Sequence, residues 1–216
     1  MRDAILIQVP SVSHYREFPA DYEQELRALE PAYLLSDDPI EQSGFHGGPE
    51  RWRAERGPVL DAIESDGSLL DVGCANGYLL DCLVRWGREQ GIDITPHGLD
   101  LGEKLIGMAR QRLPGFSDNF HVGNAWNWRP PMRYDYVYML WDCLPQSHLA
   151  DGIRRLLGEF LAPEGRLILG SYGSRSRNEK PFDIARFVRE MDIEPDGVAW
   201  GGDPPLTLFV WIDAPR

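Results

Sequence analysis

A turn rich in small residues and a carboxylate that follows it suggest most of the chemistry of this sequence. The turn reads Asp71-Val72-Gly73-Cys74-Ala75-Asn76-Gly77, and the small residues at positions 73, 75 and 77 let a ligand approach the backbone closely. Asp100 stands twenty-three residues after the last of these glycines. A carboxylate accepts hydrogen bonds and donates none, so it suits the two hydroxyl groups of a ribose. Together the turn and Asp100 predict a site for a nucleoside.

Two predicted strands must bring this turn and Asp100 to the same place. The first is the apolar run 68–72, which leads into the turn, and the second is 92–99, which ends beside Asp100. Residues 78–88 read as the helix between them, with leucines on its inner face. Because ligands of open α/β sheets bind beyond the carboxyl ends of the strands, the turn and the carboxylate are expected to face one site.

The remaining pattern predicts an α/β fold. The last two apolar runs, 198–200 and 206–212, leave no room for a crossover helix between them, which indicates an antiparallel pair. We therefore expect a Rossmann-like, doubly wound, mostly parallel seven-stranded sheet with a C-terminal antiparallel hairpin. The other expected strands are 119–122, 134–141 and 166–170, and the other expected helices are 50–64, 102–113, 148–161 with Ser147 as its N-cap, and 182–191.

Residues 1–49 differ from the rest and predict a cap or lid rather than a domain of their own. They hold several prolines and only one helical stretch, over 21–30. The domain that binds the ligand is then expected over 50–216. His46 lies among glycines in the loop 43–49, where it could close over the site as a general base or be a solvated loop residue.

Composition narrows the class of partner. The 216 residues include 22 Lys+Arg and 34 Asp+Glu, a net charge of −12, whereas proteins that bind nucleic acid usually carry a basic face. Nucleic acid is therefore not expected as the main partner. No apolar run approaches the roughly 20 residues that span a bilayer, so a membrane is not expected either. Three cysteines without C-x-x-C spacing favour a reducing, cytoplasmic setting, and the histidines show no metal-ligand spacing. The basic stretch 175–180 reads as a solvated loop or an anion-binding lid.

The turn does not fit a dinucleotide. The fingerprint G-x-G-x-x-G would need glycines at 73, 75 and 78, and the chain has Ala75 and Tyr78 at the last two positions. Asp71, two places before Gly73, would repel a diphosphate and instead suits a cation such as the ammonium group of an amino acid. A ribose on one side and an ammonium group on the other describe S-adenosylmethionine better than NAD, which is kept as a minor alternative.

Residues 69–77 resemble the first motif of class I S-adenosylmethionine-dependent methyltransferases of the small-molecule type, an acidic residue followed by G-x-G-x-G. Asp100 matches the acidic residue that this family places on the ribose, and 122–125 resembles the segment that edges the adenine ring. Residues 134–137 and 161–167 resemble the family's fourth strand and the entry to its fifth, so the similarity covers about residues 50–213. In two departures, Ala75 replaces the middle glycine and Asn124 replaces an acidic residue, which should weaken the adenine contact.

The resemblance implies S-adenosylmethionine as the cofactor. Trp126 could cover the adenine face or anchor a loop, and Leu140 could meet the methionine arm or belong to the core. Arg53 could reach the cofactor carboxylate. The expected cofactor-binding residues are Asp71, Gly73, Cys74, Ala75, Asn76, Gly77, Asp100, Leu101, Asn124, Ala125, Trp126, Leu140 and Arg53.

The substrate side is expected around residues 141–145, which follow the fourth parallel strand. Asp142 could orient an amine or accept its proton, and it could equally cap a helix. Trp141 and Tyr172 are expected to line the substrate pocket. The predicted function is methyl transfer to an oxygen or nitrogen atom of a small molecule. A non-methylating enzyme of the same fold and a catalytically silent protein that binds S-adenosylmethionine are the alternatives.

Overall fold

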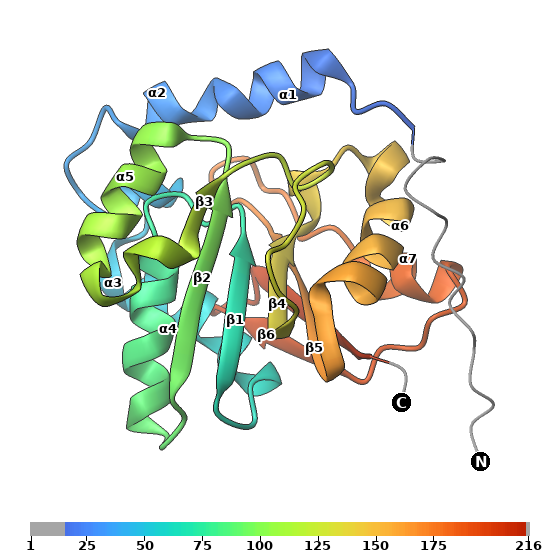
Figure 1. Ribbon diagram of the computed structural model, residues 1–216. Helices are drawn as coiled ribbons and strands as arrows, with labels where there is room; N and C mark the ends of the chain where they lie inside the picture. The colour runs from blue at the N-terminus through green and yellow to red at the C-terminus, as the bar shows by residue number, and fades with distance from the viewer. Residues whose placement is uncertain (1–15, 215–216) are drawn as a thin grey trace.

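A seven-stranded sheet forms the centre of the molecule, and helices cover both of its faces (Figure 1). The computed structural model describes residues 16–214. The strands are β1 (Gly67–Val72), β2 (Ile94–Asp100), β3 (Phe120–Val122), β4 (Tyr134–Leu140), β5 (Leu161–Tyr172), β6 (Gly197–Gly201) and β7 (Thr207–Asp213). The helices are α1 (Ala20–Arg27), α2 (Leu29–Tyr33), α3 (Gly48–Arg56), α4 (Tyr78–Glu89), α5 (Glu103–Arg112), α6 (Gln146–Arg155) and α7 (Ile184–Glu190).

The order of strands in the sheet is β3-β2-β1-β4-β5-β7-β6. The pairs from β3 to β5 are all parallel, and β7 runs antiparallel to both β5 and β6. The order reverses direction between β1 and β4, which makes the carboxyl ends of these two strands the switch point of the sheet. The predicted fold class, including the C-terminal antiparallel hairpin, is confirmed.

Strand β1 shows why the buried strands form as they do. Its side chains alternate between two core layers, so Leu69 packs with the helices α3 to α5 and Leu70 packs on the opposite face. Both leucines are fully buried, as expected of a central parallel strand covered on both sides. Helix α4 contributes Leu80 and Leu83 to the first layer. The second layer is covered by α6, its extension and α7.

Several expected boundaries differ from the structure, among them the single helical stretch over 21–30, which is divided into α1 and α2. The single helix expected over 50–64 is wrong: α3 ends at Arg56 and a 3₁₀ turn, Gly57–Ala62, follows it. Pro58 explains the break, because proline lacks the N–H that a continuing α-helix needs. Ser147 is not the N-cap of α6, since that helix starts one residue earlier behind Pro145, and the Ser147 hydroxyl instead contacts His148 Nδ1 at 2.9 Å. Strand β5 starts at Leu161 rather than at residue 166.

The segment before α3 lies over one edge of the sheet. Figure 1 shows α1 and α2 stretched across the edge at which β1 and β2 end. Farther along the same segment, Ile40 and Phe45 are buried in the core layer that contains α4. The start of the predicted cap, residues 1–15, lies outside the described residues. No helix within 16–214 is long and apolar enough to cross a membrane.

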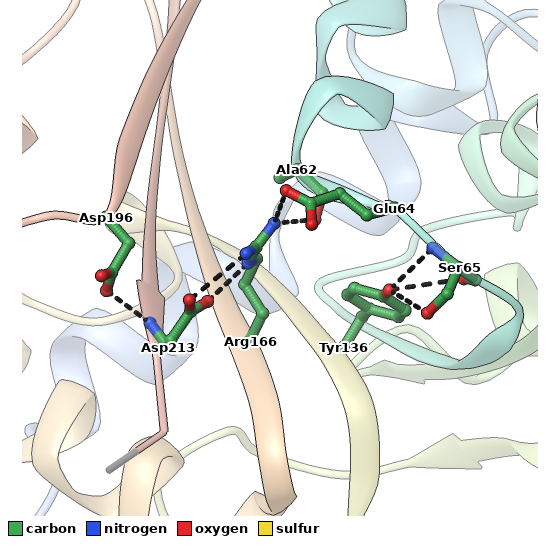
Figure 2. Close-up of polar contacts among 7 residues, drawn as sticks. All are labelled: Ala62, Glu64, Ser65, Tyr136, Arg166, Asp196 and Asp213. Carbon is green, nitrogen blue, oxygen red and sulfur yellow. Dashed lines mark hydrogen bonds and ion pairs between the residues drawn. The ribbon is translucent and has the colours of Figure 1, made fainter. Parts of the chain in front are cut away.

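At the opposite end of the strands, Arg166 on β5 connects neighbouring elements (Figure 2). Its guanidinium donates to Asp213 Oδ1 at 2.6 Å, to Glu64 Oε1 at 3.0 Å and to the Ala62 carbonyl at 3.0 Å. These contacts join β5 to β7 and to the turn that leads into β1. Asp213 and Glu64 meet Arg166 in the first half of β5, whereas the turn after β1 and Asp100 lie at the carboxyl ends of their strands. We therefore assign this network to the scaffold and not to the candidate site.

Candidate active site

A cavity of about 930 Å³, its open mouth included, lies between the cap helices and the carboxyl ends of β1, β2 and β4. The cap contributes Leu26, Leu29, Glu30, Tyr33 and Ser43 to its wall. The structure thus brings together residues far apart in sequence at the switch point of the sheet. Among the predicted site residues, those on the cavity wall are Gly73, Ala75, Asp100, Leu101, Asn124, Ala125, Leu140 and Asp142.

Two glycines of the turn after β1 are required by its geometry. Gly73 has φ +89°, and a Cβ there would lie 2.7 Å from Cys143 Sγ. Gly77 has φ +72°, and a Cβ there would lie 2.8 Å from the Cβ of Ala109 on α5. Ala75 adopts φ +46° although it carries a side chain, a conformation that costs about 1 kcal/mol. The turn therefore presents backbone rather than side chains to the cavity.

Asp100 is held in place by backbone N–H groups. Its Oδ2 accepts from the amide of Ala75 at 2.8 Å and its Oδ1 accepts from the amide of Gly102 at 2.7 Å. A carboxylate oxygen has a second lone-pair direction, so both oxygens can still accept from a ligand. Burial raises the pKa of Asp100, and the two amide hydrogen bonds oppose that rise. The arrangement fixes an acceptor pair on the cavity wall, as binding of a ribose requires.

Asp71 lies behind the turn and not on the cavity wall. Its side chain is 3 % exposed, and no other residue among 16–214 donates a hydrogen bond to its carboxylate. Burial, followed by the charge of Asp100, raises the pKa of Asp71 to about 8. A cation that approached it would lower this pKa again. Asp71 is therefore a buried acid whose charge depends on what occupies the neighbouring space.

Asn76 faces the segment before α3 instead of the cavity. Its Nδ2 donates to the Pro39 carbonyl at 3.0 Å and to Gln42 Oε1 at 3.1 Å, and its Oδ1 accepts from the Ser43 hydroxyl at 2.9 Å. Cys74 is buried too, and burial raises the pKa of its thiol well above the usual value. Contrary to the expectation of ligand contact, the Asn76 side chain connects the turn to residues 39–43.

The segment that follows β3 is bonded to the cap. Asn124 accepts from the Trp126 amide at 2.7 Å and donates from Nδ2 to Glu23 Oε2 at 2.8 Å. Trp126 donates from its indole to the Arg16 carbonyl at 2.9 Å, and its ring meets His148 edge-on at 4.8 Å. Of the two readings of Trp126, the arrangement favours the loop anchor. Asn124 retains one acceptor direction toward the cavity.

Arg155 on α6 organises the same segment, and the sequence pattern did not single it out. Its guanidinium donates to the carbonyls of Ala125, Trp126 and Trp128 at 3.0, 2.6 and 2.5 Å, and to Glu159 at 2.9 Å. The side chain is 5 % exposed. One buried cation thus satisfies three backbone acceptors of an irregular loop. A charged residue on the inner face of an amphipathic helix was the one signal that could have indicated it.

Asp142 is the carboxylate nearest the end of β4 on the cavity wall. Burial raises its pKa, and no side chain within 16–214 forms a hydrogen bond or ion pair with it. Tyr22 donates its hydroxyl to the Asp142 carbonyl at 2.8 Å. Burial and then the charge of Asp142 raise the pKa values of Tyr22 and Tyr33 to about 12. Asp142 therefore faces the cavity beside two neutral phenols.

Four other candidates lie away from the cavity wall. Trp141 stacks on Phe182 at 4.4 Å between ring centroids, and the Tyr172 hydroxyl pairs with that of Tyr138 at 2.5 Å. The Arg56 guanidinium lies 3.4 Å from the centroid of the Tyr172 ring. The two remaining candidates are His46, whose side chain is 76 % exposed, and Arg53, which pairs with Glu89 on α4 at 2.5 Å. Their positions differ from the expectation because the direction of each side chain depends on packing between helices.

The cap also closes the N-terminus of α5. Glu30 Oε1 accepts from the amide of Lys104 at 2.6 Å and from that of Leu105 at 3.3 Å. The helix has Gly102 at its N-cap and no side-chain cap of its own. A carboxylate at this position satisfies free N–H groups and complements the helix dipole. Local sequence could not reveal this contact, because its two partners are more than seventy residues apart.

We expect Asn124→Asp, which would restore the acidic residue usual in the resembled family, to weaken the docking of α1. The new carboxylate would replace the amide that lies 2.8 Å from Glu23 Oε2, at a cost of about 1–2 kcal/mol. Faster tryptic cleavage after Arg27 would report the loosened helix. Adding Glu23→Gln should restore protection, whereas Glu25→Gln on the exposed side of α1 should not. Unchanged cleavage in Asn124→Asp would contradict the role of this contact.

One family model matches this chain, and solved structures share its fold. A sequence profile for a methyltransferase domain matches residues 45–194. Among curated proteins, none matches the sequence significantly. At 12–17 % identity, the likeness of the solved structures concerns the fold.

Three solved structures illustrate that likeness. A chain in the complex between the Haloferax volcanii Trm112 methyltransferase activator and a methyltransferase has a TM-score of 0.62 at 14 % identity, covering 88 % of this chain and 98 % of that one. A SAM-dependent methyltransferase from Aquifex aeolicus has a TM-score of 0.57 at 14 % identity, with coverages of 86 % and 98 %. One from Geobacter sulfurreducens, in complex with S-adenosylhomocysteine, has a TM-score of 0.53 at 15 % identity, with coverages of 78 % and 92 %.

Proposed function

We propose that this chain, which belongs to the class I S-adenosylmethionine-dependent methyltransferases, transfers the methyl group to an oxygen or nitrogen atom of a small molecule. Membership follows from the profile match over 45–194, which is more than half of the 216 residues, and from the fold. The predicted enzyme class and the predicted cofactor, S-adenosylmethionine, are thereby confirmed. We also propose which residues bind the cofactor and the acceptor.

The cavity wall supports a specific placement of the cofactor. We assign the ribose to Asp100, because both of its oxygens are fixed by amides and keep a free acceptor direction. The adenine ring would lie between Leu101 and the segment that holds Asn124 and Ala125. The methionine arm would pass Gly73, where no side chain can stand, toward the buried Asp71. The fixed carboxylate beside the side-chain-free turn is the observation that carries this placement.

The protein's task in such a reaction is alignment and exclusion of water. The sulfonium supplies an activated methyl group, so no group of the chain has to activate the donor. In-line attack needs the acceptor atom about 3–3.5 Å from the methyl carbon. Leu26, Leu29 and Tyr33 of the cap cover the cavity, and their apolar surfaces would exclude water from the reacting atoms. Asp142, on the same wall, would orient the acceptor.

The enclosure of the site favours a small acceptor. The cap helices contribute Leu26, Leu29, Glu30 and Tyr33 to the cavity wall, opposite the ends of the strands, and a concave site enclosed in this way suits a small ligand. The three cysteines are free thiols, which supports a reducing, cytoplasmic location. The Haloferax volcanii methyltransferase is in complex with an activator protein, so assays of this chain should be run both alone and with a candidate activator protein.

The test combines binding with turnover. S-adenosylhomocysteine should raise the melting temperature, since a ligand that binds only the folded state stabilises it. Labelled S-adenosylmethionine should then transfer its methyl group to small molecules and not to purified protein or RNA. Binding without transfer to any acceptor would support the silent alternative, and transfer of another part of the cofactor would support a non-methylating enzyme. Transfer only to a macromolecule would overturn the proposed acceptor class.

A further inference from the structure

Resting on the proposed function, we infer that the acceptor is an amine that enters as an ammonium cation and that Asp142 takes its proton. The charged residues of the cavity wall are Glu30, Asp100 and Asp142, and all three are acidic. The wall has no Arg, Lys or His among residues 16–214. A carboxylate or phosphate substrate would therefore meet only like charge there, at a cost that grows as water is excluded.

The three carboxylates have different positions along the cavity. Asp100 and Glu30 lie at the end assigned to the ribose, where amides of Ala75, Gly102 and the start of α5 already hold them. Asp142 lies at the other end, beyond β4, where its own backbone N–H is the hydrogen-bond donor to its carboxylate and no side chain within 16–214 pairs with it. It is therefore the wall carboxylate that remains available to a second ligand.

The surroundings of Asp142 suit an organic cation. Tyr33 lines the same cavity, and Tyr22 is hydrogen-bonded to the Asp142 carbonyl at 2.8 Å. An ammonium group gains from an aromatic face as well as from a carboxylate, and both are present here. A divalent metal would need a tighter set of ligands, and residues 16–214 contain no group of three or more His, Cys, Asp or Glu side chains that could hold one.

The composition of the cap also favours a cationic acceptor. Residues 16–49 contain eight Asp or Glu and only two Arg, with no Lys. This segment contributes Leu26, Leu29, Glu30, Tyr33 and Ser43 to the cavity wall. A concentration of negative charge around an entrance raises the local concentration and the association rate of cations. The acidic composition of the segment over the cavity and the carboxylates of its wall thus point to one class of acceptor.

The proposed step balances in atoms and charge. The ammonium group gives one proton to Asp142, and the freed lone pair of nitrogen forms the new bond to the methyl carbon. The bond between that carbon and sulfur breaks, and its electron pair stays on sulfur. The product is a methylated ammonium ion beside S-adenosylhomocysteine. Asp142 then releases its proton through the mouth of the cavity.

Matched acceptors separate the charge classes. The panel contains 2-phenylethylamine, 3-phenylpropionate and 4-ethylphenol. Two further sets carry an amine, a carboxylate or a hydroxyl group on an indole and on a short alkyl chain. We expect kcat/KM for amines to exceed that for the acids and phenols by at least about 10²-fold. A preference for carboxylates or phenols would overturn the amine inference and leave the proposed function standing. Methyl transfer to none of these molecules would overturn the proposed function itself.

Asp142→Asn tests the proton acceptor. We expect kcat/KM for amines to fall by about 10²–10⁴-fold, the usual contribution of a general base, while the Kd for S-adenosylhomocysteine stays within about twofold. Asp118→Asn, an exposed site outside the cavity, should change neither quantity. A variant with undiminished amine turnover would contradict the role of Asp142.

The pH profile distinguishes proton transfer from a structural role. An amine that deprotonates in solution no longer needs Asp142, so the deficit of Asp142→Asn should shrink as pH rises from about 7 to about 10. The titratable groups around Asp142 are Tyr22, Tyr33, Tyr172 and Cys143, and burial raises the pKa of each, which keeps them neutral over most of this range. A deficit that stays constant with pH would contradict proton transfer.

Discussion

Asp100→Ala should raise the Kd for S-adenosylhomocysteine by at least about 10²-fold. Each hydrogen bond to a charged group contributes about 1.5–3 kcal/mol, and Asp100 is assigned two bonds to the ribose. Loss of about 3 kcal/mol corresponds to a factor of about 10² in affinity. Removal of Asp100 also frees the amides of Ala75 and Gly102, which would loosen the backbone at both sides of the ribose site. Isothermal titration calorimetry measures the change directly.

Asp118→Ala provides the control for Asp100→Ala, because it removes an exposed carboxylate outside the cavity and should leave the Kd unchanged. Circular dichroism would establish that both variants fold. A 2′,3′-dideoxy analogue of S-adenosylhomocysteine sharpens the test. Because this analogue lacks the two ribose hydroxyl groups, its Kd should be the same for Asp100→Ala and for the parent chain. Full affinity for S-adenosylhomocysteine in a folded Asp100→Ala protein would remove the ribose assignment.

Arg155→Met should destabilise the protein by about 3–5 kcal/mol, the range observed when one partner of a buried charged network is removed. The substitution keeps an unbranched apolar stem but leaves the carbonyls of Ala125, Trp126 and Trp128 without their donor. Each buried acceptor without a partner costs about 1–3 kcal/mol. Urea denaturation at pH 7 would give the change in the free energy of unfolding.

The neighbouring arginine supplies the control. Arg154→Met removes a partly exposed guanidinium whose only ion pair within residues 16–214 is with Asp151 at 3.6 Å, on the same helix. Such pairs contribute little, so we expect a change within about 0.5 kcal/mol. Equal effects of the two substitutions would show that Arg155 acts through helix propensity and not through the loop carbonyls.

Local pattern was sufficient for the strands and the turn of this fold. The apolar run 68–72 predicts a buried strand, and it forms β1 between two covered faces of the sheet. The glycines at 73 and 77, also evident from the sequence, stand where a Cβ would not fit. The end of β2 followed from the same reasoning, which placed Asp100 on the cavity wall. The apolar run and the glycine-rich turn are local patterns, so the sequence reveals them, although the atoms that exclude a Cβ at positions 73 and 77 belong to the distant residues Cys143 and Ala109.

Side-chain direction and contacts between distant segments were not predictable in this way. Arg53 lies on α3, but the face of α3 that carries it turns toward Glu89 on α4. Glu30 accepts a hydrogen bond from the first turn of α5, and Glu23 accepts one from the side chain of Asn124. Arg155 donates to carbonyls of a loop about thirty residues before it. None of these pairs has a periodic or compositional signature. They arise from the packing of the cap and of α6 against the sheet, which only three-dimensional structure shows.

Because Glu30 completes the first turn of α5, the cap and the enzyme core cannot be treated as interchangeable modules. Grafting the first 49 residues of a relative onto this scaffold, in order to transplant its acceptor preference, would also exchange the carboxylate that finishes α5 and the partners of Asn76. Chimeras divided at residue 50 should therefore inherit a poorer nucleoside pocket along with a new cover. Successful hybrids would need α5 and the turn before it to be exchanged together with the cap.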